Sequence, residues 1–415
     1  MKFGQWSMGV RGWPRRRAPQ LVFPLVAALA CGSESSSESG PVGGQHEDPD
    51  FSSQALLQNL GERVIASYED FAGAAEQLEA STEAWAGSLD EADRRDAQQA
   101  WRDAMVVWQP SELYRFGPGG EPTTVYGGQG LGDTIYSWSL SVNPCRVDQE
   151  TLEDAFMDPE ALAAEAVNVR GLDALEYLLF NDSTDNACAT NLSINTDGLW
   201  ADRLDEVPQL RADYAAALAR EVRTNADALL AAWDPDEGDF LEQLVGAGEP
   251  SSVYPSLGAA FVDIGGAMLY IDQQTKERKV AIPAGIAGCE TATCPESVES
   301  PFAMVSTQNI RGNLTGLHLL FVGNLPDQEE AYGLDDQLRD YGADATAEAM
   351  AIDLQAAIDS ADALEEDTLV ESLEQSLDQV QDLYDALVVL TGEIKTELVR
   401  DLGIDLTAPG AGDAD

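Results

Sequence analysis

Histidine is scarce in this chain of 415 residues, which contains only His46 and His318. No HExxH sequence occurs, so the common two-histidine zinc site of metalloproteases cannot form on a helix. No GxSxG sequence occurs either, which removes the usual nucleophile elbow of serine hydrolases. His318 lies among leucines, as expected of a histidine in a helical core. The commonest hydrolase sites are therefore excluded.

Basic residues are also few, with 23 Lys and Arg against 74 Asp and Glu and a formal net charge of -51. Beyond residue 17 the basic residues form no cluster. A surface of this sign repels the phosphate backbone, so nucleic acid is excluded as a partner. The acidity is explained by a solvated surface, and it also favours the approach of cations without defining a site for them.

The first 31 residues have the pattern of a signal peptide. Basic residues precede a short apolar run at residues 20–30, which is too short to span a bilayer. The run ends in the sequence ALAC, whose cysteine, Cys31, is expected to be the lipidation site of a lipoprotein; plain secretion is the alternative. No aspartate follows Cys31, which favours the outer membrane in a cell that has one. Residues 32–52 are predicted to be a flexible tether.

Four further cysteines remain in the exported part of the chain. An even number of cysteines in an exported protein indicates disulfides. Cys289 and Cys294 enclose only four residues, and pairing them leaves Cys145 for Cys188. Metal thiolates are the alternative, but the chain lacks a CxxC pair.

Apolar residues recur every three or four positions along several segments, and no segment alternates as a strand would. We therefore predict an all-α fold of amphipathic helices packed as bundles. The main predicted helices span 54–80, 91–116, 160–181, 202–232 and 369–398. A weak repeat aligns Asn168–Glu176 with Asn313–Phe321, which suggests an internal duplication. Glycines and prolines interrupt the pattern at 236–254, so we predict a first helical bundle at 53–235, a linker at 236–254, and a second helical bundle at 255–408.

Two acidic residues stand out on the predicted helix at 160–181. Asp173 and Glu176 are three positions apart, so their carboxylates share one helical face beside several leucines. A carboxylate in apolar surroundings must be paired, protonated or bound to a cation. A metal cation, iron or calcium, would be held by their oxygens. The alternative is a structural ion pair with Arg170 or Arg115.

Several stretches, in order, are similar to the imelysin-like family, a family also classed with metallopeptidases. The similarity extends over residues 53–408, and the segment GLDALEYLLF at 171–180 falls on the family's GxHxxE motif. Gly171 and Glu176 match the motif, whereas Asp173 stands where the motif has histidine. The other stretches that carry the resemblance are WQPSELYRFGP at 108–118, IYSW at 135–138, CRVDQ at 145–149, TKERKVAIP at 275–283, ESP at 299–301 and LGI at 402–404.

The resemblance implies two helical bundles, an envelope location and a role in iron uptake. It also implies a metal or ligand site at the motif, where the loss of histidine leaves an oxygen-only pair and weakens the case for transition-metal binding and for peptidase activity. We expect Asp173 and Glu176 to face a polar pocket between helices. Residues of the other motif stretches are expected to complete it: Glu112, Arg115, Asp148 and Ser300.

The sequence thus predicts a lipid-anchored, periplasm-facing binding protein. Its predicted partners are a small ligand or metal ion, the membrane through the lipid anchor, and an envelope protein. A metallopeptidase and a non-catalytic protein-binding scaffold are the alternatives.

Overall fold

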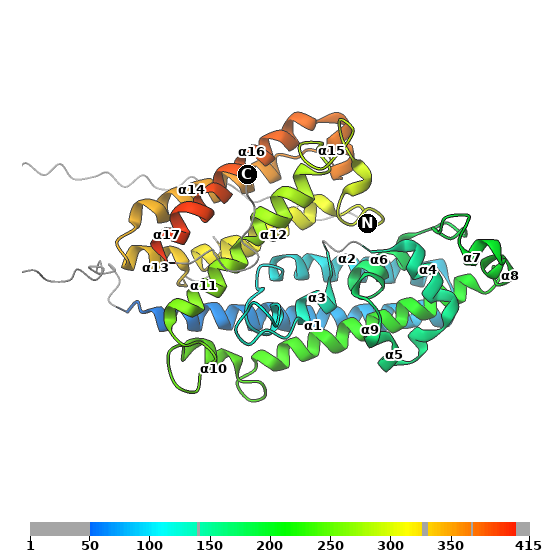
Figure 1. Ribbon diagram of the computed structural model, residues 1–415, viewed down its shortest axis with the longest axis horizontal. Helices are drawn as coiled ribbons and strands as arrows, with labels where there is room; N and C mark the ends of the chain where they lie inside the picture. Colours follow the sequence, from blue (N-terminus) through cyan, green and yellow to red (C-terminus); the bar gives the residue numbers. More distant parts are fainter. Residues whose placement is uncertain (1–49, 139–141, 326–330, 367, 404–415) are drawn as a thin grey trace, which may run out of the picture. The chain divides into compact units, whose positions relative to one another are not determined.

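The computed structural model describes residues 50–138, 142–325, 331–366 and 368–403. These residues form helices and loops and contain no strand, which confirms the predicted all-α fold (Figure 1). The predicted signal peptide, the predicted lipidation site Cys31 and most of the predicted tether lie outside the described residues.

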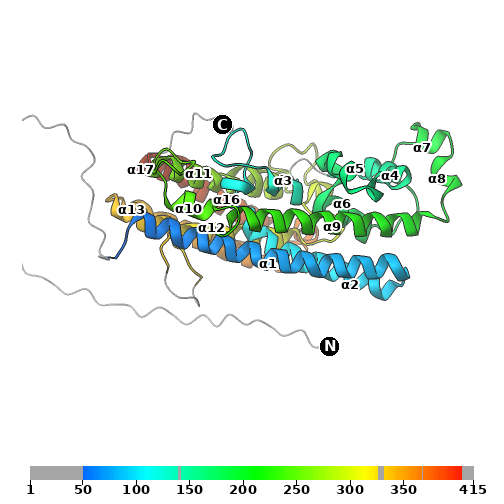
Figure 2. The same ribbon diagram turned by 90° about the horizontal axis from the view of Figure 1, so that it is seen from below.

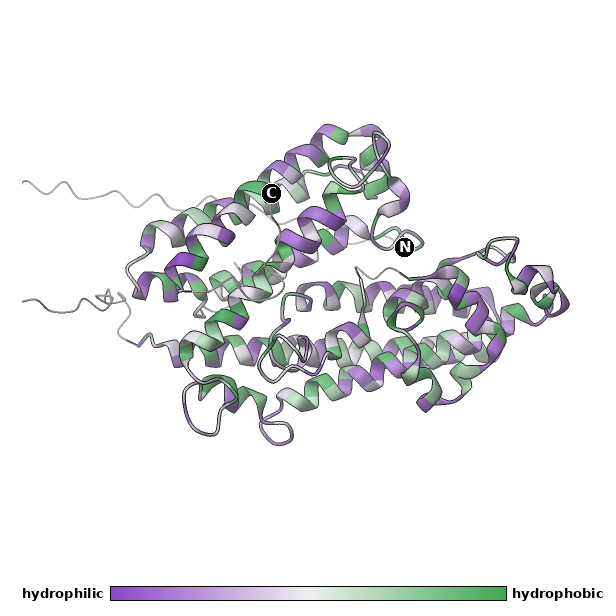
Figure 3. Cartoon of the chain, in the orientation of Figure 1, coloured by the Kyte–Doolittle hydropathy of each residue, from purple (hydrophilic) through white to green (hydrophobic). Residues whose placement is uncertain are grey.

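Three long helices build the first half of the described chain: α1 (Ser53–Ser88), α2 (Glu91–Ser111) and α9 (Val207–Trp233). α1 packs along both α2 and α9, as Figure 2 shows from below. The buried stripe of α1 follows the predicted helical spacing, with Leu57, Leu60, Val64, Tyr68, Phe71, Ala75 and Leu78 all buried. Figure 3 shows hydrophilic and hydrophobic residues mixed along each long helix, as expected where one face packs and the other is solvated.

The helix predicted at 160–181 is wrong as a single element. The chain forms α5 (Pro159–Ala164), a 3-10 turn η3 (Val167–Val169) and α6 (Gly171–Phe180) in its place. The last break is fixed by Gly171, whose φ of 67° lies in the left-handed region. A Cβ atom on this residue would lie 2.6 Å from the carbonyl oxygen of Ile135, so only glycine fits here.

Shorter helices connect these elements. They are η1 (Gly117–Gly119), α3 (Leu131–Ile135), α4 (Pro144–Glu153), η2 (Ala155–Met157), α7 (Ser193–Thr196), α8 (Leu199–Asp202) and α10 (Phe240–Val245). α10 lies in the predicted linker at 236–254 and packs against α1.

The second half contains α11 (Leu257–Met268), a π-helix η4 (Ile271–Ala281), a 3-10 turn η5 (Pro295–Ser297) and α12 (Ser306–Val322). It continues with α13 (Leu334–Asp340), α14 (Asp344–Asp362), α15 (Leu369–Gln375), α16 (Leu377–Glu393), the π-turn η6 (Ile394–Leu398) and α17 (Val399–Asp401). The helix predicted at 369–398 is therefore interrupted at Ser376, where α15 ends. α14 packs on α12 and α16, while α12 also packs on α2 of the first half.

Both predicted disulfides are present, Cys145–Cys188 and Cys289–Cys294. The first joins α4 to the loop before α7, and Cys188 packs there with Ile194, Trp200 and Val207 in a small separate core. Among the described helices, none combines the length and apolar character needed to cross a membrane.

Candidate functional site

The motif helix α6 presents two buried carboxyl groups. Asp173 and Glu176 are 4% and 3% exposed, although both are charged residue types. Left-handed Gly171 starts the helix against Ile135, and this contact sets the first turn of α6 beside the Tyr136–Ser137 segment. The two carboxyl groups are thus held in the interior by the glycine of their own motif.

Asp173 is held by Ser137. Its Oδ2 accepts hydrogen bonds from the Ser137 backbone N–H at 2.8 Å and from the Ser137 hydroxyl at 3.0 Å. The arginines expected as counter-ions pair elsewhere: Arg170 with Glu221, and Arg115 with Asp133. Neutral donors therefore take the place of the expected ion pair.

Glu176 is held by a strained loop of the second half. Its Oε1 accepts hydrogen bonds from the backbone N–H groups of Phe302 at 2.9 Å and Ala303 at 2.8 Å. The loop reaches this position with two non-glycine residues at positive φ, Ser300 at 50° and Met304 at 61°. Strained backbone of this kind is concentrated at ligand and active sites. α6 and the second half are thereby joined through one carboxylate.

A second pair of carboxylates surrounds a fully buried lysine. Lys279 Nζ lies 2.9 Å from Glu112 Oε2 and 3.0 Å from Glu299 Oε1, and all three side chains are fully buried. Gln109 Oε1 accepts a further hydrogen bond from the same ammonium at 2.9 Å. The Tyr270 ring centroid lies 5.4 Å from Nζ, in reach of a cation–π contact. The lysine therefore has polar or aromatic partners on several sides.

The two pairs of carboxyl groups belong to one polar cluster. Tyr136 donates a hydrogen bond to Glu299 Oε1 at 2.7 Å, and its neighbour Ser137 holds Asp173. We refer to Glu112, Asp173, Glu176 and Glu299 as the carboxyl cluster. It combines α2 and α6 of the first half with the loop before α12 of the second half.

Close packing of α12 on α2 brings these parts together. A Cβ atom on Gly312 would lie 2.6 Å from Gln109 Cβ, and one on Gly316 would lie 3.0 Å from Pro110 Cα and closer still to the Pro110 carbonyl oxygen. Asn313, between the two glycines, donates from Nδ2 to Glu112 Oε2 at 3.1 Å and to the Gln109 backbone oxygen at 2.9 Å. The small residues thus allow an amide to reach the cluster.

Burial makes the cluster hold protons. Desolvation raises the pKa of Asp173 to about 7, against the hydrogen bonds from Ser137 that lower it. Desolvation likewise raises the pKa of Glu176 to about 8, although the Ala303 and Phe302 N–H groups oppose the shift. The pKa of Glu299 is also raised, first by burial and then by Glu112. The cluster therefore carries less negative charge near neutral pH than its composition suggests.

Two oxygens of the cluster are left without a hydrogen-bond partner among the described residues. They are Glu112 Oε1 and Glu299 Oε2, and both are buried. A buried polar atom without a partner is costly and calls for an explanation such as a bound ligand. The hydroxyl of Tyr270 is also buried without a partner beside Glu112, and all three atoms are closed off from solvent, so a ligand reaches them only if neighbouring side chains move.

Not all predicted site residues meet here. Glu112 belongs to the cluster, and Ser300 follows Glu299, with its Oγ accepting from Asn309 Nδ2 at 3.1 Å. Arg115 pairs with Asp133, and its guanidinium lies 5.3 Å from the Tyr270 ring centroid.

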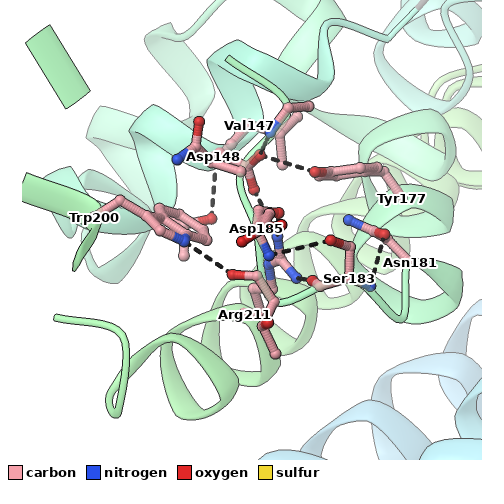
Figure 4. A network of polar contacts seen from close by, with 12 residues as sticks. Val147, Asp148, Tyr177, Asn181, Ser183, Asp185, Trp200 and Arg211 are labelled. Carbon is pink, nitrogen blue, oxygen red and sulfur yellow. Dashed lines mark hydrogen bonds and ion pairs between the residues drawn. The ribbon is translucent and has the colours of Figure 1, made fainter. Parts of the chain in front are cut away.

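Asp148 belongs to a different network. It binds the Tyr177 hydroxyl at 2.8 Å, Arg211 at 3.0 Å and the Ala187 N–H at 2.7 Å (Figure 4). This network ties α4 and α6 to α9, beside the Cys145–Cys188 disulfide. None of these three partners belongs to the carboxyl cluster, so Asp148 lies in a separate network.

Sequence reasoning did not select several residues that the site depends on. Lys279, Glu299, Tyr136, Ser137, Gln109 and Asn313 were absent from the predicted set. All of these residues except Asn313 are polar residues within stretches that resemble the family. Their place in those stretches was the signal that could have identified them. Asn313 could be found only through the weak repeat, in which it aligns with Asn168.

The arrangement does not fit a resident metal at Asp173 and Glu176. One oxygen of each carboxyl, Asp173 Oδ2 and Glu176 Oε1, already accepts two hydrogen bonds from N–H or O–H donors. Within residues 50–138, 142–325, 331–366 and 368–403, no group of three or more His, Cys, Asp and Glu side chains has metal-holding geometry. His318 lies apart, with Nε2 3.1 Å from the Asn324 carbonyl oxygen. We therefore derive no step from a metal at this pair.

The raised carboxyl pKa values give a testable pH dependence. The folded protein keeps the Glu176 proton up to about pH 8, whereas the unfolded chain releases it near the ordinary value for glutamate, so stability falls as pH rises between these values. Glu176→Gln keeps an acceptor for the Phe302 and Ala303 N–H groups and removes the titration. We expect the variant to gain about 2 kcal/mol over the wild type between pH 6 and pH 9, measured by urea unfolding.

The control for this experiment is Glu348→Gln, which changes an exposed glutamate of α14. It should leave the pH slope unchanged. Parallel pH profiles for Glu176→Gln and the wild type would show that Glu176 does not titrate in this range.

The fold and the site define an all-α protein with a buried polar cluster built by both halves of the chain. The Imelysin family model matches residues 64–394, and the chain belongs to this family. It is 24% identical over 294 residues to the iron-regulated protein A of Synechococcus elongatus, covering 69% of this chain and 70% of that protein.

Two solved structures share the fold. One is described as an iron-regulated protein A precursor from Parabacteroides distasonis, with a TM-score of 0.63, 15% identity, and coverage of 86% of this chain and 97% of that chain. The other is an imelysin-like protein from Psychrobacter arcticum, with a TM-score of 0.61, 16% identity, and coverage of 86% and 98%.

Proposed function

We propose that this protein binds iron, or a ligand linked to iron uptake, at the cell envelope, and that Glu112 and Glu299 of the carboxyl cluster receive it. The observation that carries the proposal is the pair of buried, unpartnered carboxylate oxygens, Glu112 Oε1 and Glu299 Oε2. They lie in a cluster of four carboxyl groups whose one buried ammonium is Lys279. A ligand with positive charge or hydrogen-bond donors would satisfy these oxygens.

The protons of the cluster favour a cationic ligand. Because burial raises the pKa of Asp173 and Glu176, each carboxyl can release a proton when positive charge arrives. Binding should then release protons and strengthen as pH rises from 6 to 9. The link to iron is supported by the relative from Synechococcus elongatus, whose name records regulation by iron.

The envelope location is supported by the sequence. A lipid on Cys31 would hold the protein on the periplasmic side of a membrane, and residues 32–52 would give it reach. The net charge of -51 disfavours contact with an anionic membrane surface, so the folded part would stand away from the lipid. A ligand could then approach from the periplasm.

Iron titration of residues 32–415 tests the binding proposal. Ferrous iron under anaerobic conditions and ferric citrate are the two probes, and metal-free citrate is the blank. We expect one of the iron probes to bind saturably, and Glu299→Gln to weaken its binding at least about tenfold because it removes a charged acceptor. The glutamine retains an oxygen for Lys279 and Tyr136, so the fold should be kept.

The matched control is again Glu348→Gln, which removes the same charge from an exposed position. It should bind as the wild type does. If neither iron probe binds at millimolar concentration, or if both variants bind equally well, the carboxyl cluster is not an iron-linked site.

A lipid on Cys31 has a separate test. Cys31→Ser should move the protein from the membrane fraction to the soluble fraction of the cells, because serine has no thiol to accept the lipid. Fractionation followed by immunoblotting measures the change, and mass spectrometry of the wild-type N-terminus identifies the lipid. A Cys31→Ser protein that stays with the membranes would argue against the anchor.

A further inference from the structure

The two oxygens proposed to receive the ligand, Glu112 Oε1 and Glu299 Oε2, are closed off from solvent, so a side chain near them has to move before a ligand arrives. Most of the surrounding side chains are buried and are held by other buried groups. Lys279 has three such partners, and Asn313 donates to Glu112 and to Gln109. Moving one of these side chains leaves its partners without water to replace it, which is costly.

Arg115 is different, because its side chain reaches solvent. It is 27% exposed, and it pairs at 2.5 Å with Asp133, whose side chain is 37% exposed. Water and dissolved ions replace either partner of such a pair, so an exposed ion pair adds little to stability. Arg115 also lies outside the helices, after the end of α2, so its side chain can change rotamer without moving a helix. Among the described side chains named around the cluster, Arg115 therefore moves at the lowest cost.

A line of contacts leads from Arg115 to the cluster. The guanidinium of Arg115 lies 5.3 Å from the ring centroid of Tyr270, which is 5% exposed. The Tyr270 hydroxyl lies beside Glu112 and is buried without a hydrogen-bond partner among the described residues, so no hydrogen bond holds the ring in its present orientation. The exposed fraction thus falls from Arg115 through Tyr270 to Glu112, which is 1% exposed. Arg115 is the outermost of the three.

We propose that the Arg115–Asp133 ion pair is the gate of the carboxyl cluster. When the pair breaks, Arg115 leaves the ring of Tyr270, the ring turns, and the way to Glu112 is open. Arg115 and Asp133 are positioning residues, which set how fast a ligand enters and leaves and make no bond to it. The inference rests on the proposed function for the identity of the ligand, but the opening itself needs no ligand.

Binding rates test the gate. Ferrous iron under anaerobic conditions and ferric citrate are the probes, and stopped-flow mixing with residues 32–415 gives the association and dissociation rates. Asp133→Asn weakens the ion pair, and Arg115→Ala removes it together with the contact on Tyr270. Because the open form is then populated more often, we expect both rates to rise about fivefold in Asp133→Asn and about tenfold in Arg115→Ala. The dissociation constant should change far less than either rate.

The two substitutions change the local charge in opposite directions, which separates gating from electrostatics. If charge alone acted, one variant would gain affinity and the other would lose it, and the two rates of each variant would move in opposite directions. A gate predicts that both rates rise in both variants. Arg203→Ala is the matched control, since Arg203 is 30% exposed and pairs with Glu206 at 2.9 Å in the segment after α8. It should leave both rates unchanged.

The gate also has a test that does not depend on iron. Hydroxyl radicals made by photolysis of peroxide oxidise tyrosines according to their exposure to solvent, and mass spectrometry of the digested protein measures each tyrosine separately. In the metal-free protein, oxidation of Tyr270 should rise several-fold in Arg115→Ala and Asp133→Asn and stay at the wild-type level in Arg203→Ala. Oxidation of Tyr341, which is 45% exposed, should be the same in all four proteins and serves as the internal reference.

Unchanged oxidation of Tyr270 in both variants would overturn the gate. A large rise in the dissociation constant of Arg115→Ala at an unchanged association rate would also overturn it, because Arg115 would then be a ligand contact. If neither iron probe binds the wild type, the proposed function fails, and the oxidation of Tyr270 alone decides whether the ion pair gates the cluster.

Discussion

Replacing Lys279 with methionine is expected to lower the free energy of unfolding by about 3–5 kcal/mol, because it leaves two buried carboxylates without their shared ammonium. Lys279 is fully buried, and its Nζ lies 2.9 Å from Glu112 and 3.0 Å from Glu299. Removing one partner of a buried ion pair costs more than the pair itself contributes, since the remaining charge has lost both water and its partner. Urea unfolding at pH 8 measures the loss.

The pH dependence identifies the cause of this loss. Burial raises the pKa of Glu299, and losing the Lys279 ammonium that lowers it raises it further, so Lys279→Met should be closer to the wild type at pH 5 than at pH 8. Glu299→Gln in the same chain should restore part of the lost stability, because it removes one of the two uncompensated charges. A loss that is equal at both pH values would point to packing, and not to charge, as the cause.

An exposed pair gives the matched control. Arg223 of α9 lies 2.9 Å from Glu79 of α1, with its side chain 40% exposed. Arg223→Met removes a cation from a solvated ion pair, and such pairs contribute about 0–1 kcal/mol. A cost for Arg223→Met that matches that of Lys279→Met would show that burial does not set the difference.

The fold could be predicted from the sequence where one helix follows one apolar stripe. The stripe from Leu57 to Leu78 predicted α1, which proved longer at its C-terminal end. The prediction of a single helix at 160–181 failed. The apolar residues keep a helical spacing from α5 through η3 to α6, although the helix is broken twice between them. The sequence identifies Gly171 only as a motif residue, and the close approach of Ile135 that makes it a break comes from a distant segment.

The site was predicted only in part, because the sequence relates residues that lie on one helix and not residues that meet through packing. Spacing placed Asp173 and Glu176 on one face of a helix, and both are buried as expected of carboxyls beside leucines. Their partners could not be inferred, because Phe302 and Ala303 bind Glu176 through backbone N–H groups, which every residue except proline possesses, and Ser137 binds Asp173 partly in the same way. A backbone donor leaves no mark in the sequence, whereas an arginine does, and this difference explains why an arginine was expected.

Lys279 was missed for a related reason. Sequence patterns find residues that share one element, and the ion pairs of Lys279 join η4 to α2 and to the loop before α12. Contacts between residues more than a hundred positions apart depend on how helices pack. Here the close packing of α12 on α2 depends on Gly312 and Gly316. Sequence spacing does not distinguish these two glycines from any other glycine in a helix.

Gly316→Ala should therefore destabilise the protein by about 2–3 kcal/mol, although alanine is the better helix former. The added Cβ would lie 3.0 Å from Pro110 Cα and closer to the Pro110 carbonyl oxygen, and both are backbone atoms that cannot rotate away. α12 would have to move off α2, taking Asn313 from Glu112 and opening the carboxyl cluster. Two readings measure the change: urea unfolding, and iron titration at pH 8.

Gly73→Ala is the matched control, because Gly73 lies within α1 and its Cβ would meet no other atom within 4 Å. This variant should gain up to about 1 kcal/mol from helix propensity. The two substitutions are chemically identical, but their effects on the free energy of unfolding are expected to have opposite signs. The difference between the two effects therefore measures how closely α12 approaches α2. If Gly316→Ala were as stable as Gly73→Ala, the two helices would have room for a methyl group, and the cluster would not depend on their close contact. If Gly316→Ala lost stability but bound iron like the wild type, the ligand would not need the cluster to be closed by Asn313.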